Sequence, residues 1–128
     1  MQSQTHLGIN AALCGTPVVL AEGAATVRLT TTASMGADDH GLVHGGFVFG
    51  LADYAAMLAV NDANVVLGSA DTRFLAPVKV GEEVVATARR TAVERRKHVV
   101  EVEAKVGDKV VMTGVFTTFV LGKHVLDS

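Results

Sequence analysis

The sequence has 128 residues, of which 49% are hydrophobic and 19% are charged, and its formal net charge is −2. This size and apolar content predict one domain over residues 1–128 and exclude intrinsic disorder. The basic runs are short, which argues against a nucleic-acid partner. The single cysteine, Cys14, excludes an intrachain disulfide and fits a reducing compartment. Because no signal-peptide pattern opens the sequence, we expect a cytoplasmic protein.

The N-terminal third of the chain predicts a lead-in followed by two strands. Residues 1–10 have the mixed composition of a loose segment. Strands are expected over residues 12–20 and 24–32. Pro17 places the first of them at a sheet edge, because proline cannot donate a hydrogen bond to a neighbouring strand. Cys14 has no triad-like partners in the sequence, so we interpret it as a small buried side chain.

Residues 33–42 form a polar loop that contains glycine. Asp38, Asp39 and His40 are metal-ligating residue types, but three adjacent side chains do not easily point at one ion. No distant set of His or Cys residues completes a coordination sphere. We therefore predict no metal site.

Residues 44–61 predict one long buried helix. Alanine and leucine, both strong helix formers, dominate the segment. Asp53 is the only charged residue between His44 and Asn61, and a helix that is apolar all round is a core helix. A carboxylate in such a helix is costly unless it has partners or a chemical role. The apolar run contains His44, Asp53 and glycines, which indicates a core helix and not a membrane span.

Gly45 and Gly46 lie where the first helical turn leaves backbone N–H groups without partners. These groups, at the positive end of the helix dipole, can hold a carbonyl oxygen or an anion. Asp53 lies about 11 Å away along the helix axis, too far to act on the same atom within one chain. The two features can hold opposite sides of a small group, or two chains can share the site. A purely structural explanation is also open. The glycine pair would then only permit a tight turn, and the Asp53 carboxylate would only be bound by a nearby group.

The C-terminal half predicts four further strands. Gly68 marks a bulge in the first of these strands, and Gly107-Asp108 is a hairpin turn. The last strand is apolar on both faces, as expected for a strand that packs on a helix and is covered by another subunit. The predicted ranges are residues 65–76, 82–94, 97–106 and 109–121.

The segments His44-Gly45-Gly46 and Leu51-Ala52-Asp53 together resemble the H-G-G-x(4)-L-A-D motif of PaaI-type (phenylacetate-pathway) acyl-CoA thioesterases. These enzymes belong to the hotdog-fold superfamily, and the resemblance extends over residues 8–121. It implies an α+β hotdog fold, in which an antiparallel sheet of five to six strands wraps around one long central helix at about residues 44–61. It also implies a homodimer or homotetramer with the active site between two subunits.

The resemblance also implies roles for the residues of the motif. Asp53 corresponds to the family's nucleophile or general base, and Gly45 or Gly46 corresponds to its oxyanion-binding N–H group. His44 can orient the helix entry or hydrogen-bond the substrate carbonyl, and a purely structural role fits it equally well. No metal and no cofactor are implied, because coenzyme A is part of the substrate.

Other positions are candidates for substrate binding. Thr72 and Phe74 lie in a segment that resembles the family strand lining the acyl pocket. Met57 stands where the family often has a hydroxyl residue that holds a water molecule, so Asn61 or Thr72 would have to take that role. The basic residues of one hairpin can bind the phosphates of coenzyme A or form a solvated tip; they are Arg89, Arg90, Arg95, Arg96 and Lys97.

The predicted function is hydrolysis of an acyl-CoA thioester to a free acid and coenzyme A. One alternative is a hotdog module that binds acyl-CoA without turnover, as a sensor or carrier. A sensor would normally carry a fused DNA-binding segment, which we do not expect within residues 1–10. A hotdog dehydratase is less compatible, because its differently spaced, proline-bearing motif is missing. The low aromatic content, 5%, gives no indication of an aromatic acyl pocket.

Overall fold

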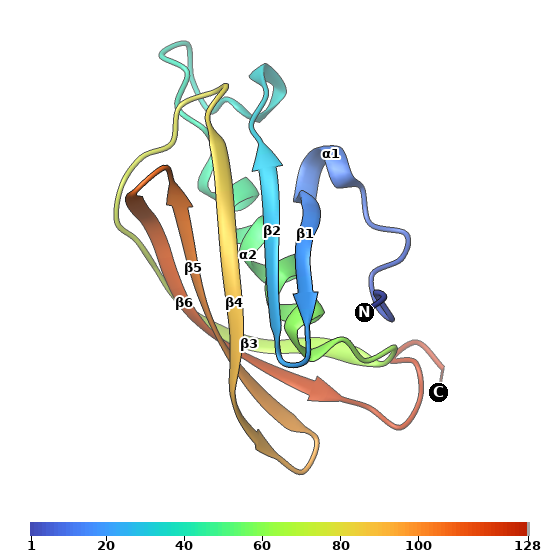
Figure 1. Ribbon diagram of the computed structural model, residues 1–128. Coiled ribbons are helices and arrows are strands. Elements are labelled where there is room, and N and C mark those ends of the chain that lie inside the picture. The colour runs from blue at the N-terminus through green and yellow to red at the C-terminus, as the bar shows by residue number, and fades with distance from the viewer. Residues whose placement is uncertain (128) are drawn as a thin grey trace.

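Six antiparallel strands form one sheet that curves around a single long helix (Figure 1). The computed structural model describes residues 1–127. The strand order in the sheet is β1-β2-β4-β5-β6-β3, so β1 and β3 form its two edges. In Figure 1, β2 and β4 lie in front of α2. The elements are α1 (Ala11–Cys14), β1 (Thr16–Ala21), β2 (Ala24–Thr30), η1 (Ala33–Met35), α2 (Gly45–Val60), β3 (Val65–Phe74), β4 (Glu83–Glu94), β5 (Lys97–Val106) and β6 (Lys109–Val120).

The predicted central helix is confirmed as α2, with bounds one residue shorter at each end than expected. His44 precedes it in an extended conformation and makes no side-chain capping bond. Asn61 ends it in the left-handed conformation, with φ 54° and ψ 46°, and its N–H donates to the Met57 carbonyl at 2.8 Å. Asparagine tolerates this conformation better than most residues, which explains why the helix stops there.

Buried alanines on both elements let α2 lie close to the sheet. The helix residues from Leu51 to Val60 are all buried except Asp53, which is partly exposed. Larger side chains such as Leu29 and Phe116 fill the remaining core space. The alanines are Ala52, Ala55, Ala56 and Ala59 on α2, and Ala86, Ala88 and Ala104 on β4 and β5. Small facing side chains shorten the distance between packed backbones, so the helix position is closely constrained.

The first predicted strand was wrong over its N-terminal part. Residues 11–14 form the short helix α1, because the Asn10 side chain accepts the Ala12 N–H at 3.0 Å and caps it. Gly15 then turns the chain at φ 104°. A Cβ at Gly15 would lie 2.8 Å from the Val27 side chain, so only glycine fits. Strand β1 starts at Thr16 and is an edge strand, as predicted for it.

The other strands agree closely with the prediction. Strand β5 has the predicted bounds, and β2, β3, β4 and β6 end within about two residues of theirs. The register of β3 shifts between Leu67 and Ser69, which confirms a bulge at Gly68. Gly107, at φ 57°, and Asp108 form the turn between β5 and β6. Hydrophobic alternation and turn chemistry therefore determined most of the sheet.

The N-terminal lead-in has no regular structure over residues 1–9, but it is bound to the end of α2. The Asn61 side chain accepts the Gln4 N–H at 2.7 Å and donates to the Gln2 carbonyl at 3.0 Å. The next residue, Thr5, is only 5% exposed. Met57 lies one turn before Asn61 and is fully buried. The lead-in thus packs on the C-terminal end of α2 and reaches back to Tyr54, whose ring lies 6.1 Å from that of His6.

Among residues 1–127, the structure contains no helix with the length and hydropathy that a membrane span requires.

Candidate active site

Asp53 is the only charged side chain on α2, and it lies on the outer side of the helix. Its Oδ1 atom is buried and has no hydrogen-bond partner among residues 1–127. Burial raises the pKa of the Asp53 carboxyl from 3.8 to about 6. A carboxyl group with this pKa is ionised at neutral pH and still basic enough to accept a proton. Asp53 therefore has the properties of a general base or a nucleophile.

The start of α2 supplies hydrogen-bond donors. The N–H groups on either side are used, since His44 donates to the Met35 carbonyl at 2.9 Å and Phe47 donates to the His44 carbonyl at 3.1 Å. Among residues 1–127, no acceptor is found for the N–H groups of Gly45 and Gly46. These two donors lie at the positive end of a helix of 16 residues. The geometry suits a carbonyl oxygen that becomes negatively charged.

An apolar pocket of about 360 Å³ opens beside Gly45. Every side chain that lines it is apolar, so it can hold a hydrocarbon group. Gly45 lines the pocket and Gly46 does not. A Cβ at Gly45 would be 3.4 Å from the Phe74 ring, whereas one at Gly46 would be 3.1 Å from the His44 ring. The lining is Leu42, Val43, Gly45, Val48, Phe74, Leu75, Ala76, Pro77, Val78 and Val111.

The predicted site residues outside the glycine pair lie in different places relative to this pocket. Phe74 lines it and is 54% exposed. Thr72 lies opposite Gly114 in β6 and is not in the pocket lining. Asn61 lies at the far end of α2, where its side chain holds the N-terminal lead-in. His44 is exposed, with its ring edge-on to Phe47 at a centroid distance of 6.2 Å.

The basic hairpin lies far from the pocket within one chain. In β5, seven residues separate Lys97 from Ala104, which lies in the same row across the sheet as Met112 and Phe74. Seven residues of strand correspond to about 23 Å. A coenzyme A molecule bound at Gly45 would have to extend over this distance for its phosphates to reach the hairpin tip.

The members of the basic cluster also point to different surroundings. Arg89 lies on the sheet face opposite α2, and the guanidinium of Arg90 donates to Glu22 at 3.1 Å. Arg95 occupies the hairpin turn with φ 55°. The Arg96 guanidinium lies against Gly122. These side chains do not converge on one anion site within the chain.

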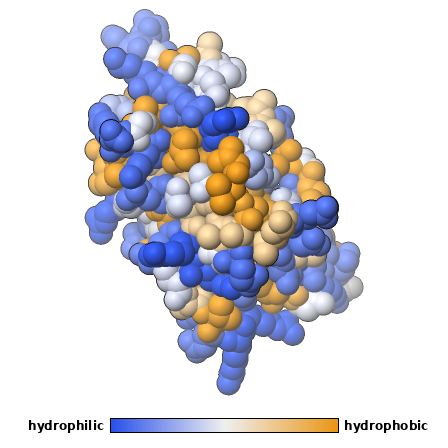
Figure 2. All heavy atoms as spheres, in the orientation of Figure 1, coloured by the Kyte–Doolittle hydropathy of each residue, from blue (hydrophilic) through white to orange (hydrophobic). Residues whose placement is uncertain are grey.

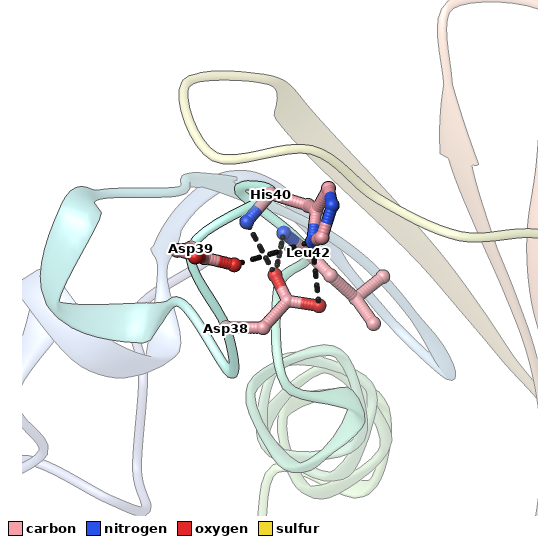
Figure 3. A network of polar contacts seen from close by, with 4 residues as sticks. All are labelled: Asp38, Asp39, His40 and Leu42. Atoms are coloured by element: carbon pink, nitrogen blue, oxygen red, sulfur yellow. Dashed lines mark hydrogen bonds and ion pairs between the residues drawn. The ribbon is translucent and has the colours of Figure 1, made fainter.

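The acidic loop before α2 organises its own backbone (Figure 3). Asp38 Oδ1 accepts the N–H groups of His40 at 3.0 Å and Leu42 at 3.2 Å. The His40 ring lies 3.3 Å from Asp39. All three polar side chains are exposed. Within residues 1–127, no three or more His, Cys, Asp or Glu side chains are arranged so that they could hold a metal ion.

Sequence reasoning missed most of the pocket lining. Val48 follows Gly45 by nearly one helical turn, and Leu42 and Val111 come from the loop before α2 and from β6. These residues look like ordinary core residues, because nothing in an apolar pattern separates a pocket wall from a packed core. The one indication of the pocket in the sequence was the position of Val48, which lies on the helix face next to the free N–H groups.

Comparison with known structures identifies the architecture as the hotdog fold. The uncharacterized protein PH1136 from Pyrococcus horikoshii matches with a TM-score of 0.98 and 50% identity, covering 99% of this chain and 98% of that one. The phenylacetic acid degradation protein PaaI from Thermus thermophilus, crystallised as a point mutant, matches with a TM-score of 0.79 and 34% identity over 86% and 96%. The PaaI-type resemblance is thus confirmed in structure.

Residues 40–113 match the model of the Thioesterase superfamily, and the chain belongs to this family. Among curated proteins, methylthioribose-1-phosphate isomerase from Aquifex aeolicus is 54% identical over 121 residues, which are 94% of this chain and 26% of that protein. Transcription factor FapR from Bacillus subtilis is 40% identical over 80 residues, 61% of this chain and 43% of that protein. The matched part of this chain thus spans about a quarter of the length of the isomerase and less than half of the length of FapR.

The burial of Asp53 predicts a pH-dependent gain of stability in Asp53→Asn. Because its folded pKa, about 6, lies above 3.8, the folded protein binds the proton more tightly than the unfolded chain. The stability that this provides is present at low pH and is lost as the pH rises towards 6. Asn avoids that loss, so the variant should match wild type near pH 4. Above pH 7 it should be more stable by about 1–2 kcal/mol, allowing for solvent screening.

Urea unfolding at pH 4 and pH 8 measures both differences. The same difference at both pH values would contradict the raised pKa.

Proposed function

We propose that the protein hydrolyses acyl-CoA thioesters that carry an apolar acyl group. The main support is the free N–H group of Gly45, which lies at a helix start and beside a pocket lined only by apolar side chains. Asp53, on the same helix, provides a carboxyl group with a pKa of about 6. Membership of the Thioesterase superfamily makes thioester hydrolysis the reaction class that fits these groups.

In this proposal the thioester carbonyl oxygen accepts a hydrogen bond from Gly45 N–H, and the acyl chain enters the pocket between Val48 and Phe74. Attack on the carbonyl carbon places negative charge on that oxygen, where the N–H dipole and the helix stabilise it. The tetrahedral intermediate collapses by breaking the carbon–sulfur bond. The thiolate of coenzyme A leaves and takes up a proton, and the acid is released.

Asp53 can drive the attack in two ways. As a general base it removes a proton from water, and the hydroxide adds to the carbonyl carbon. As a nucleophile its carboxylate forms an anhydride with the acyl group, which water then hydrolyses. Both routes need the ionised carboxylate. Because Asp53 lies eight residues after Gly45, roughly 12 Å along the helix, the carboxylate at one substrate comes from a second subunit.

The edge strand β3 supports a homodimer. Within residues 1–127 its ten residues pair with β6 on one side only, and its last residue, Phe74, and the following Leu75 are 54% and 57% exposed. A long unprotected edge is a template for pairing with another strand. Pairing of β3 with β3 of a second copy would continue the sheet and bring two helices together. Light scattering at micromolar concentration should give at least the mass of two chains, and a one-chain mass would refute the shared site.

Asp53→Asn should lower turnover of an apolar acyl-CoA by about 10²-fold or more, because it removes the base or nucleophile. Release of free thiol from coenzyme A measures the rate. In wild type, activity should rise with pH through an apparent pKa near 6, since the ionised form is the active one. Wild-type turnover in a folded Asp53→Asn protein would remove Asp53 from the mechanism.

Gly45→Pro should lower turnover by about 10²–10³-fold, because proline has no N–H group to bind the oxyanion. Proline is tolerated at the first helical position, so the fold should persist. Gly45→Ala is the matched control: it keeps the N–H, and its Cβ would only touch the Phe74 ring at 3.4 Å. If Gly45→Pro is folded by circular dichroism and as active as Gly45→Ala, Gly45 is not the oxyanion donor.

A second candidate is an acyl-CoA-binding module without turnover, favoured by the 40% identity to the transcription factor FapR over 80 residues. The same pocket and N–H groups would then hold the ligand, and Asp53 would have no chemical role. Calorimetric binding of acyl-CoA without release of thiol would favour this function. Thiol release that depends on Asp53 would exclude it.

A further inference from the structure

The apolar pocket beside Gly45 has an exposed mouth and a buried floor. Exposed apolar residues alone do not mark a ligand site, since Figure 2 shows them among hydrophilic ones on the side of the molecule that it presents. This pocket differs because it leads from the surface into the core. At its mouth lie side chains that are 41%, 54% and 57% exposed, those of Leu42, Phe74 and Leu75. At its floor lie four valines that are at most 5% exposed: Val43, Val48, Val78 and Val111.

Val48 connects the start of α2 to this floor. It follows Gly45 by three residues, so the two lie on the same side of the helix. Gly45 is partly exposed, whereas Val48 is only 3% exposed. With the thioester carbonyl on the Gly45 N–H, as proposed above, the acyl chain extends past Val48 into the core. It ends against the floor, where Val111 is 1% exposed.

Backbone hydrogen bonds hold the walls of the pocket in place. The Val43 N–H donates to the Val78 carbonyl at 2.8 Å, and the Leu75 N–H donates to the Val111 carbonyl at 2.8 Å. These bonds join the loop before α2, the segment after β3 and the strand β6 into one frame. The valine side chains of the floor are β-branched and have few alternative rotamers. The floor therefore cannot move away from a longer chain without straining this frame.

The volume of the pocket sets an upper limit on the chain that it can hold. An apolar cavity of about 150 Å³ accommodates the six carbons of benzene, which corresponds to roughly 25 Å³ per carbon. On this scale, the pocket volume of about 360 Å³ holds no more than about fourteen carbons. The exposed mouth shares part of that volume with solvent, so a chain that reaches the floor is shorter than this limit.

Building on the proposed function, we propose that Val48 and Val111 limit the length of the acyl chain, so that the protein selects straight medium-chain acyl groups of about eight to twelve carbons. Each methylene added below this length moves from water into an apolar wall and should raise affinity about fourfold. Once the chain reaches the floor, further methylenes stay in water at the mouth or displace a valine. The gain per carbon therefore stops at a definite length.

Binding of unreactive ketone analogues of straight-chain acyl-CoAs, from acetyl to palmitoyl, tests this limit by calorimetry. Affinity should rise with each added carbon and then stop rising between octanoyl and dodecanoyl. Affinity that keeps rising to palmitoyl, or that does not depend on chain length, would overturn the inference. Because the analogues are not hydrolysed, this outcome is independent of turnover. The expected binding profile without thiol release from acyl-CoA would support the length limit and contradict only the proposed hydrolysis.

Two substitutions should move the limit in opposite directions. Val111→Ala removes two carbons from the floor and should lengthen the longest well-bound chain by about two carbons. Ala76→Leu adds three carbons to a partly exposed lining residue, so it should shorten that chain by about three carbons and leaves the buried core intact. Ala63→Leu, in the exposed turn after α2, is the matched control and should leave the profile unchanged.

Ala76→Leu decides the question if Val111→Ala does not fold, because it removes nothing from the core. An unchanged chain-length profile in folded Ala76→Leu would overturn the inference, as would the same shift in Ala76→Leu and Ala63→Leu.

Discussion

The packing of α2 against the curved sheet determines where every other feature lies. Alanines on both surfaces bring the helix close to β4 and β5, and the strands on either side fold around it. Once the helix is fixed, its start presents the free N–H group of Gly45 to the pocket, and its outer side presents Asp53. The groups of the proposed site are thus positioned by a core, which holds their geometry more firmly than loops would.

Asp53 is the one charged residue in the buried, otherwise apolar part of α2. All nine other residues from Leu51 to Val60 are buried apolar groups or a buried tyrosine, whereas Asp53 has a buried oxygen without a partner among residues 1–127. Burial of this kind destabilises the charged form and raises the pKa. A protein selected for stability alone would not keep such a residue. We propose that it is present for a chemical role in which a moderately basic carboxylate is needed.

Much of the fold was predictable because it follows from local patterns. The apolar run predicted α2, the alternation of apolar and charged residues predicted β5, and Gly107-Asp108 predicted the last hairpin. The short helix α1 was missed because its first turn depends on the Asn10 cap and on Gly15, features that look like loop residues in a sequence. Asn61 was interpreted as a site residue, yet its side chain holds the N-terminal lead-in.

Within the site, the motif located Asp53 and the glycine pair but could not choose between Gly45 and Gly46. The pocket favours Gly45, because Gly45 lines it and Gly46 does not. The sequence could not show this, because the pocket wall comes from three separate parts of the chain, which only the folded structure brings together. The distance between the basic hairpin and the pocket also could not be predicted from the sequence. The basic hairpin was predicted to bind the phosphates of coenzyme A, and the strand register places its tip, Lys97, seven residues along β5 from the row of Phe74.

The most direct test of the account is a crystal structure with an acyl-CoA analogue in which a methylene group replaces the thioester sulfur. Such a ketone keeps the carbonyl oxygen and cannot be hydrolysed. The account predicts that this oxygen lies within about 3.2 Å of Gly45 N, with the acyl chain between Val48 and Phe74. It also predicts that Asp53 of a second copy faces the carbonyl carbon. A carbonyl oxygen bound away from the start of α2, or an acyl chain outside the apolar pocket, would contradict it.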